Sequence, residues 1–215
     1  VEAHFTFETQ VAHGKGIVRL REGRCHTLFT MMTDLKGHEE KKGRTRALGV
    51  RHKADPSRET WSEARAREQA ALGHTEEPYC LIIGGGQGGI ALGARLKQLG
   101  VSTLIVEKNA RAGDSWRNRY RTLVLHDPVW YDHLPYIPFP EHWPVFTPKD
   151  KMGDWLEMYA KVMELNYWTS TICIGASYDE AENAGRSNSS APANGSSSNR
   201  ANSYSPPAPT VRRAA

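Results

Sequence analysis

A glycine-rich segment between two short apolar runs constrains the fold of this chain more than any other feature. The apolar run 79–83 leads into glycine-rich residues 84–89, and a helical pattern follows over 90–99. A second apolar run, residues 104–106, lies within the strand-like segment 102–107, which ends in Glu107. This order and these lengths predict a strand, a helix and a second, parallel strand, which together form the βαβ unit of a Rossmann-type sheet.

The spacing Gly84-x-Gly86-x-x-Gly89 is typical of dinucleotide binding. Gly84 allows the tight turn, Gly86 lets a pyrophosphate approach the backbone, and Gly89 lets helix and strand pack closely. The start of the helix offers unpaired amides and the positive end of the helix dipole to the phosphates. Glu107 can accept hydrogen bonds from both ribose hydroxyls and disfavours a 2′-phosphate. The residues therefore predict FAD or NAD(H) as the ligand rather than NADP(H).

The segment after Glu107 distinguishes between these two ligands. Residues 107–120 resemble the E-[KR]-x(4)-G-x-x-W-x-x-R-Y signature of class B flavoprotein monooxygenases, and residues 121–126 and 135–140 are similar to fungal flavin-containing monooxygenases. The resemblance covers about residues 78–180. It implies that FAD is the ligand, and that Trp116 and Arg117 lie along the flavin or its ribityl chain.

The resemblance also implies a function. It is that of an FAD- and NADPH-dependent monooxygenase, in which NADPH reduces FAD, O₂ adds to give a C4a-hydroperoxyflavin, and a small organic substrate is oxygenated. The cofactor carries this chemistry, so no catalytic side chain is assigned. The candidate cofactor-binding residues are Gly84, Gly86, Gln87, Gly88, Gly89, Glu107, Lys108, Asp114, Ser115, Trp116, Arg117 and His126. Two alternatives stay open: an NAD-binding dehydrogenase fragment, and a non-catalytic, vestigial FAD-binding protein.

The sequence departs from the family pattern in three ways. No second GxGxxG follows residue 107, so the NADPH site of the family is not found. The F-x-G-x(3)-H-x(3)-[YF] monooxygenase fingerprint is absent, and the family-like sequence stops near Glu182. We therefore expect a truncated chain that does not oxidise NADPH by itself.

Changes in composition predict four regions within an α/β chain. Strand-like runs before residue 37 are similar to the last strands of an NTF2-like (SnoaL-like) region. The predicted regions are the NTF2-like remnant at 1–49, a helical linker at 50–77, an incomplete FAD-binding Rossmann-type domain at 78–182, and a disordered tail at 183–215. Within the linker one helix is expected, with Asp55 as N-cap, Pro56 as its first residue and Gly73 as its stop. Within the third region we expect a core-facing helix that starts with a Thr147 capping box, and a third strand over 168–174.

Composition excludes several other classes. No apolar run approaches the length of a membrane span. The cysteines, Cys25, Cys80 and Cys173, are too far apart for a disulfide framework or a zinc site, and with no leader sequence they indicate the cytoplasm.

Neither the net charge nor the histidines indicate a nucleic-acid partner or a metal site. The chain has 28 Lys and Arg against 24 Asp and Glu, but its excess of base lies in the arginines from residue 186 onward, so nucleic-acid binding is not indicated. His126, Asp127, Asp132 and His133 lack the spacing of a metal site, and no metal is expected.

Overall fold

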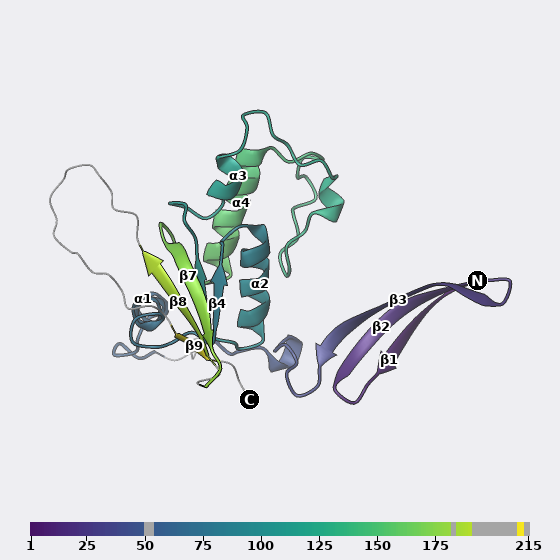
Figure 1. The fold of residues 1–215 in the computed structure, drawn as a ribbon, viewed down its shortest axis with the longest axis horizontal. Coiled ribbons are helices and arrows are strands. Elements are labelled where there is room, and N and C mark those ends of the chain that lie inside the picture. The colour runs from purple at the N-terminus through teal and green to yellow at the C-terminus, as the bar shows by residue number, and fades with distance from the viewer. Residues whose placement is uncertain (50–53, 182–183, 191–209, 213–215) are drawn as a thin grey trace. The chain divides into compact units, whose positions relative to one another are not determined.

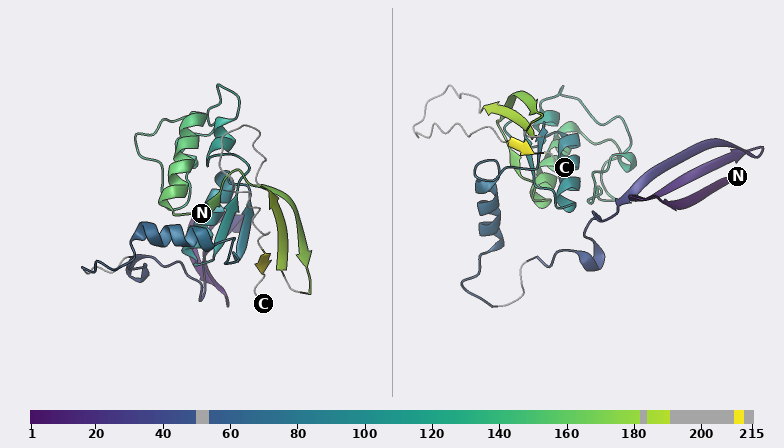
Figure 2. Two further views of the ribbon diagram at one scale, coloured as in Figure 1. Left: turned by 90° about the vertical axis from the view of Figure 1, so that its left-hand side faces the viewer. Right: turned by 60° about the horizontal axis from the view of Figure 1, so that its bottom comes forward.

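A computed structural model describes residues 1–49, 54–181, 184–190 and 210–212 of the chain (Figures 1 and 2). The chain divides into two units, Val1–Arg51 and His52–Ala215. The first unit is an antiparallel sheet of β1 (Glu2–Glu8), β2 (Ala12–Arg21) and β3 (Arg24–Leu35), followed by the short 3-10 helix η1 (Gly43–Thr45). The turn between β2 and β3 contains two residues of positive φ, Glu22 (51°) and Gly23 (74°).

The second unit contains the predicted βαβ unit. It consists of β4 (Cys80–Ile83), α2 (Gln87–Gln98) and β5 (Thr103–Val106), with Cys80 paired to Thr103 in parallel. The two-residue strand β6 (Tyr167–Trp168) adds to the other side of β5, also in parallel, which gives the order β4-β5-β6. The α/β fold with a partial Rossmann-type parallel sheet is thus confirmed.

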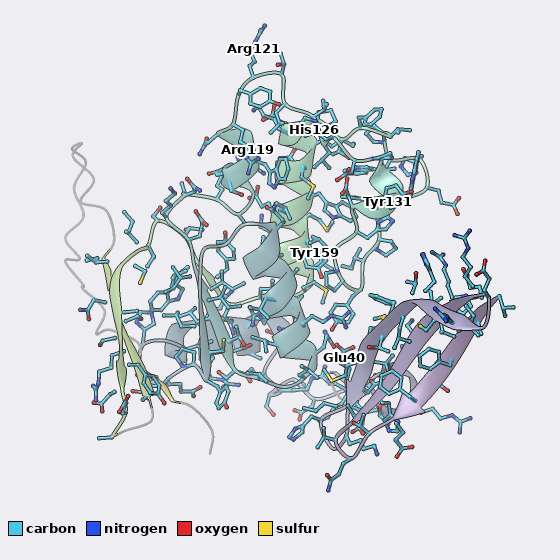
Figure 3. The ribbon with its side chains drawn as sticks, turned by 45° about the vertical axis from the view of Figure 1, so that its right-hand side comes forward. Glu40, Arg119, Arg121, His126, Tyr131 and Tyr159 are labelled. Atoms are coloured by element: carbon cyan, nitrogen blue, oxygen red, sulfur yellow. The ribbon has the colours of Figure 1, made fainter. Side chains whose placement is uncertain are left out.

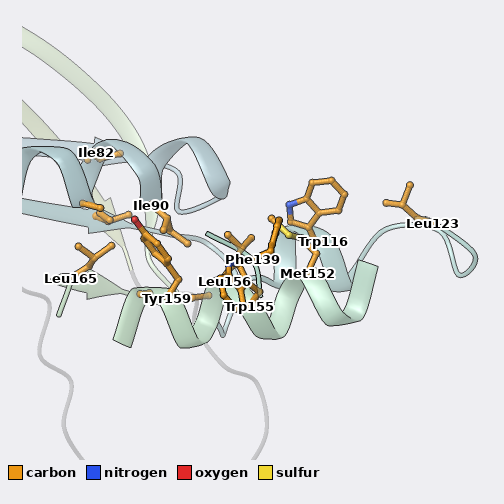
Figure 4. Close-up of a cluster of buried hydrophobic side chains, with 14 residues drawn as sticks. Ile82, Ile90, Trp116, Leu123, Phe139, Met152, Trp155, Leu156, Tyr159 and Leu165 are labelled. Atoms are coloured by element: carbon orange, nitrogen blue, oxygen red, sulfur yellow. The ribbon is translucent and has the colours of Figure 1, made fainter. Parts of the chain in front are cut away.

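Both faces of the central strand β5 are buried, in keeping with its apolar run, residues 104–106. On one face Leu104 and Val106 pack against Leu72. On the other face Ile105 joins a cluster that includes residues of α2 and α4 (Lys149–Val162), where Ile90 and Tyr159 are fully buried (Figure 4). Helix α4 contributes its residues at the predicted helical spacing: Met152, Trp155, Leu156 and Tyr159.

Two helices begin differently from the prediction. Helix α1 spans Trp61–Ala71, so it starts later than Asp55, because Thr60 and Glu63 cap each other's backbone amides. Asp55 instead accepts hydrogen bonds from Ser57 in a local turn. Helix α4 has no side-chain cap, because its N-cap is Pro148 rather than Thr147, and the Thr147 hydroxyl instead accepts a hydrogen bond from the Trp143 indole.

The strand expected over 168–174 is divided in two. β6 ends at Trp168, and β7 (Ile172–Asp179) belongs to a different sheet. Between them the Ser170 amide donates to the carbonyl of Asn109, and the Thr171 amide donates to the carbonyl of Glu107. These two bonds turn the chain away from the direction of β6.

Part of the tail expected to be disordered forms strands. β8 (Ala184–Ser190) pairs antiparallel with β7, and β9 (Thr210–Arg212) pairs antiparallel with β8. For these residues the prediction was wrong, because ladder hydrogen bonds come from the backbone and need few apolar side chains. Ala184 and Ser187 are also buried. The remaining residues of the predicted tail lie outside the described residues.

Candidate dinucleotide-binding site

The glycine turn lies at the carboxyl end of β4, next to the carboxyl end of β5. Gly84 has a φ of 99°, which favours glycine, and its amide donates to the carbonyl of Val106 at 2.9 Å. Gly86 is the N-cap of α2, so the amides of the first helical turn have no acceptor within the helix. This end also carries the positive end of the helix dipole, and the turn therefore has the shape and polarity that bind an anion.

The glycines of the turn differ in what surrounds them. A Cβ at Gly89 would lie 2.0 Å from the carbonyl oxygen of Gly84, and a Cβ at Gly85 would lie 1.9 Å from the hydroxyl of Tyr167. A Cβ at Gly84 or Gly88 would meet nothing within 4 Å, and one at Gly86 would meet only Ser115 Oγ, at 3.6 Å. Packing therefore closes the turn at positions 85 and 89 and leaves it open to a ligand at 84, 86 and 88.

Glu107 follows β5 and braces this turn. Its side chain is buried, and one carboxylate oxygen accepts a hydrogen bond from the Gly85 amide at 2.7 Å. The other oxygen accepts from the amide and the side chain of Asn109, at 2.9 and 2.6 Å. The carboxylate is thus fixed at the edge of the turn, with acceptor capacity remaining on the oxygen that binds Gly85.

Helix α3 (Asp114–Arg117) contributes two residues beside the turn. The Trp116 indole donates to the side-chain oxygen of Gln87 at 3.0 Å, and the Arg119 guanidinium lies over the Trp116 ring. Ser115 Oγ is buried and has no hydrogen-bond partner within the described structure. Because an unpaired buried hydroxyl is costly, its place near Gly86 fits a polar ligand group.

Arg117 and Asp114 belong to a network of ion pairs and hydrogen bonds between helices. The Arg117 guanidinium donates to Asp114, Asp154 and Glu157, each at 2.8–2.9 Å, and to the carbonyl of Ala112. These bonds join α3 to α4. The resemblance implied that Arg117 lies along the cofactor, whereas in this structure its donors are taken up by the neighbouring helix and loop.

Lys108 and His126 are exposed, and within the part of the chain that the structure describes neither forms a hydrogen bond to the glycine turn. Figure 3 shows His126 on the segment that follows α3, beyond Arg121 at its tip. That segment continues into the short 3-10 helix η2 (Val129–Tyr131). Contacts between described residues therefore join the glycine turn to Glu107, Ser115 and Trp116, and no hydrogen bond among them joins Lys108 or His126 to it.

Sequence reasoning missed two residues that contact the site. Asn109 orients Glu107. It lies only two residues after Glu107, and Asn side chains commonly form hydrogen bonds to nearby groups, so the sequence could have indicated this contact. Tyr167 donates its hydroxyl proton to the carbonyl of Gly85 at 2.7 Å, from 82 residues further along the chain. No local pattern indicates such a contact.

The ion pairs around Glu157 predict a pH dependence of stability. The hydrogen bond from Arg111, with the nearby charges, holds the pKa of Glu157 below its ordinary value of 4.5. The stabilisation is therefore complete above that value and is lost as the pH falls through the lowered pKa. We expect Glu157→Gln to lower the free energy of unfolding by about 1 kcal/mol or less at neutral pH, and by less at an acidic pH where the Glu157 carboxylate becomes protonated, as measured by urea unfolding. Equal losses at both pH values would contradict the ion-pair account.

The comparisons with known proteins concern the segment that carries this site. Residues 82–146 match the model of an NAD(P)-binding Rossmann-like domain. This match agrees with the βαβ geometry.

Two curated proteins illustrate the similarity. An uncharacterized CzcO-like oxidoreductase of Geobacillus kaustophilus is 42% identical over 94 residues, which are 44% of this chain and 27% of that protein. The indole-3-pyruvate monooxygenase YUCCA1 of Oryza sativa subsp. japonica is 33% identical over 110 residues, 51% of this chain and 27% of that protein. The chain thus spans about a quarter of the length of these relatives.

The fold is also similar to a solved structure, that of OTEMO in complex with FAD and NADP. The TM-score is 0.50 at 22% identity, over 63% of this chain and 25% of that one. This similarity shows the fold alone. Among the described residues, no helix has the length and apolar character needed to cross a membrane, and no group of three or more His, Cys, Asp or Glu is placed to hold a metal ion.

Proposed function

We propose that this chain is part of a flavin-dependent monooxygenase and that the glycine turn, Gly84–Gly89, holds the diphosphate of FAD. The observation that carries the proposal is the backbone at positions 84, 86 and 88, which is open to a ligand beside the Ser115 hydroxyl, a group with no hydrogen-bond partner among the described residues. The match to a Rossmann-like domain and the similarity to a monooxygenase of indole-3-pyruvate support it.

Each residue of the site has a part in this proposal. The amides of Gly86 and of the first turn of α2 bind the diphosphate, since those of Gly84 and Gly85 already donate to Val106 and Glu107, and Ser115 donates a hydrogen bond to it. Glu107 accepts from the ribose through its remaining capacity, and Trp116 holds Gln87 and with it the start of α2. When bound, FAD supplies the redox chemistry, and this part of the chain fixes its nucleotide end.

Further parts of the proposal concern the whole protein. We propose NADPH as the reductant, a small organic molecule as the substrate, and an NTF2-like origin for residues 1–49, whose antiparallel strands support it. No GxGxxG follows residue 107, so the NADPH site is proposed to require sequence beyond this chain.

We expect that the FAD-loaded chain does not oxidise NADPH. Hydride transfer needs the nicotinamide held against the flavin, which requires a binding site of its own. Anaerobic mixing with NADPH, followed by flavin absorbance, measures this. Fast and saturable bleaching would show that the chain contains a nicotinamide site.

The assignment of Glu107 predicts the effect of removing its carboxylate. Glu107→Ala removes the acceptor of the buried Gly85 amide and the proposed contact to the ribose. We expect FAD binding to weaken by about 1–3 kcal/mol, measured by quenching of flavin fluorescence. The exposed Glu141 provides the control, and Glu141→Ala should leave the Kd unchanged. An unchanged Kd in Glu107→Ala would argue against this site.

A further inference from the structure

Both polar backbone groups of Gly85 form hydrogen bonds with side chains, one from Glu107, which follows β5, and one from Tyr167 in β6. Its amide donates to Glu107 at 2.7 Å, and its carbonyl oxygen accepts from the Tyr167 hydroxyl at 2.7 Å. The Tyr167 hydroxyl also fills the space where a side chain at position 85 would lie. The middle of the glycine turn is therefore fixed from the side of the sheet.

The bond from Tyr167 determines where the next amide points. In a planar trans peptide the C=O and the following N–H point in opposite directions. The carbonyl of Gly85 points to Tyr167, so the N–H of Gly86 points away from it. A Cβ at Gly86 would have only Ser115 Oγ nearby, so this amide lies at an open position of the turn.

The Tyr167 hydroxyl stays protonated and can therefore donate this hydrogen bond. Burial, together with the negative charges of Glu107 and Asp114, raises the pKa of Tyr167 above its ordinary value. The hydroxyl is therefore a donor throughout the physiological pH range. Tyr167 and Trp168 of β6 pair in parallel with β5, and this pairing fixes the backbone from which the Tyr167 ring extends.

We propose that Tyr167 is a positioning residue for phosphate binding: its hydrogen bond to the carbonyl of Gly85 aims the Gly86 amide at the diphosphate of the ligand. This role rests on the proposed function, because it requires a dinucleotide at the glycine turn. It adds a residue from a third strand, which the GxGxxG pattern does not contain.

The experiment compares two probes, ADP and adenosine, which share the nucleoside and differ in the diphosphate. In Tyr167→Phe the ring is kept and the hydroxyl is lost. We expect the Kd of ADP to rise about threefold to tenfold and the Kd of adenosine to stay within about twofold, both measured by NMR titration. Tyr131 is 76% exposed, and the control Tyr131→Phe should change neither Kd.

The ratio of the two Kd values separates positioning from folding. A variant that is partly unfolded binds both probes more weakly by the same factor, so the ratio does not change. An equal loss of both probes, or an unchanged Kd for ADP, would overturn the role of Tyr167 while leaving the proposed function intact. A wild-type chain that binds neither ADP nor FAD would overturn the proposed function and this role with it.

Discussion

Replacing Gly113 by alanine is expected to lower the free energy of unfolding by about 2–5 kcal/mol. Gly113 has a φ of 89°, which costs an L-residue about 1–2 kcal/mol, and a Cβ there would lie 2.1 Å from the carbonyl oxygen of Gly153. Because the obstacle is the backbone of α4, relief requires α3 and α4 to separate, which adds about 1–3 kcal/mol. Urea unfolding measures the sum.

Gly100→Ala is the matched control for Gly113→Ala. Gly100 has a similar φ of 74°, but a Cβ there would meet nothing within 4 Å. Gly100→Ala should therefore lower the free energy of unfolding only by the cost of the positive φ, about 1–2 kcal/mol. Equal losses in the two variants would mean that the close contact between Gly113 and Gly153 contributes nothing.

Replacing Gly89 by alanine is expected to affect both stability and ligand binding. Its Cβ would lie 2.0 Å from the carbonyl oxygen of Gly84, so α2 must move away from β4. We expect a loss of about 1–3 kcal/mol in stability and a weakening of FAD binding by about tenfold or more, because the same shift displaces the amides of the turn.

The neighbouring residue provides the control for stability. Gly88 lies in the same helical turn, and a Cβ there would meet nothing within 4 Å. Gly88→Ala should leave stability unchanged or raise it by up to about 1 kcal/mol, because alanine favours the helix. If Gly89→Ala were as stable as Gly88→Ala, the close approach of helix and strand would not be required.

The βαβ unit was predictable because its signals are local. Strand, glycine turn and helix are adjacent in the sequence. The structure also shows why glycine is needed at two of the positions: Gly84 has a positive φ, and a Cβ at Gly89 would collide with the carbonyl oxygen of Gly84. The capping box at Thr60 and Glu63 was equally local, but it competed with the Asp55-Pro56 pattern, and sequence alone did not rank the two.

The remaining features depend on contacts between distant residues. Tyr167 reaches Gly85 from a strand of two residues, too short for any periodic pattern. Arg117 was placed by resemblance along the cofactor, yet three acidic side chains, two of them on α4, accept its hydrogen bonds. Such choices are decided by which acceptors the fold brings near a side chain, and the local sequence does not contain that information.

Titration of the purified chain with FAD tests the central claim most directly. The account predicts saturable quenching of flavin fluorescence, competition by ADP, and a Kd that rises about tenfold or more in Gly89→Ala. A chain that retains NAD and never binds flavin, or that binds FAD equally well with alanine at position 89, would contradict the assignment of the glycine turn to the diphosphate of FAD.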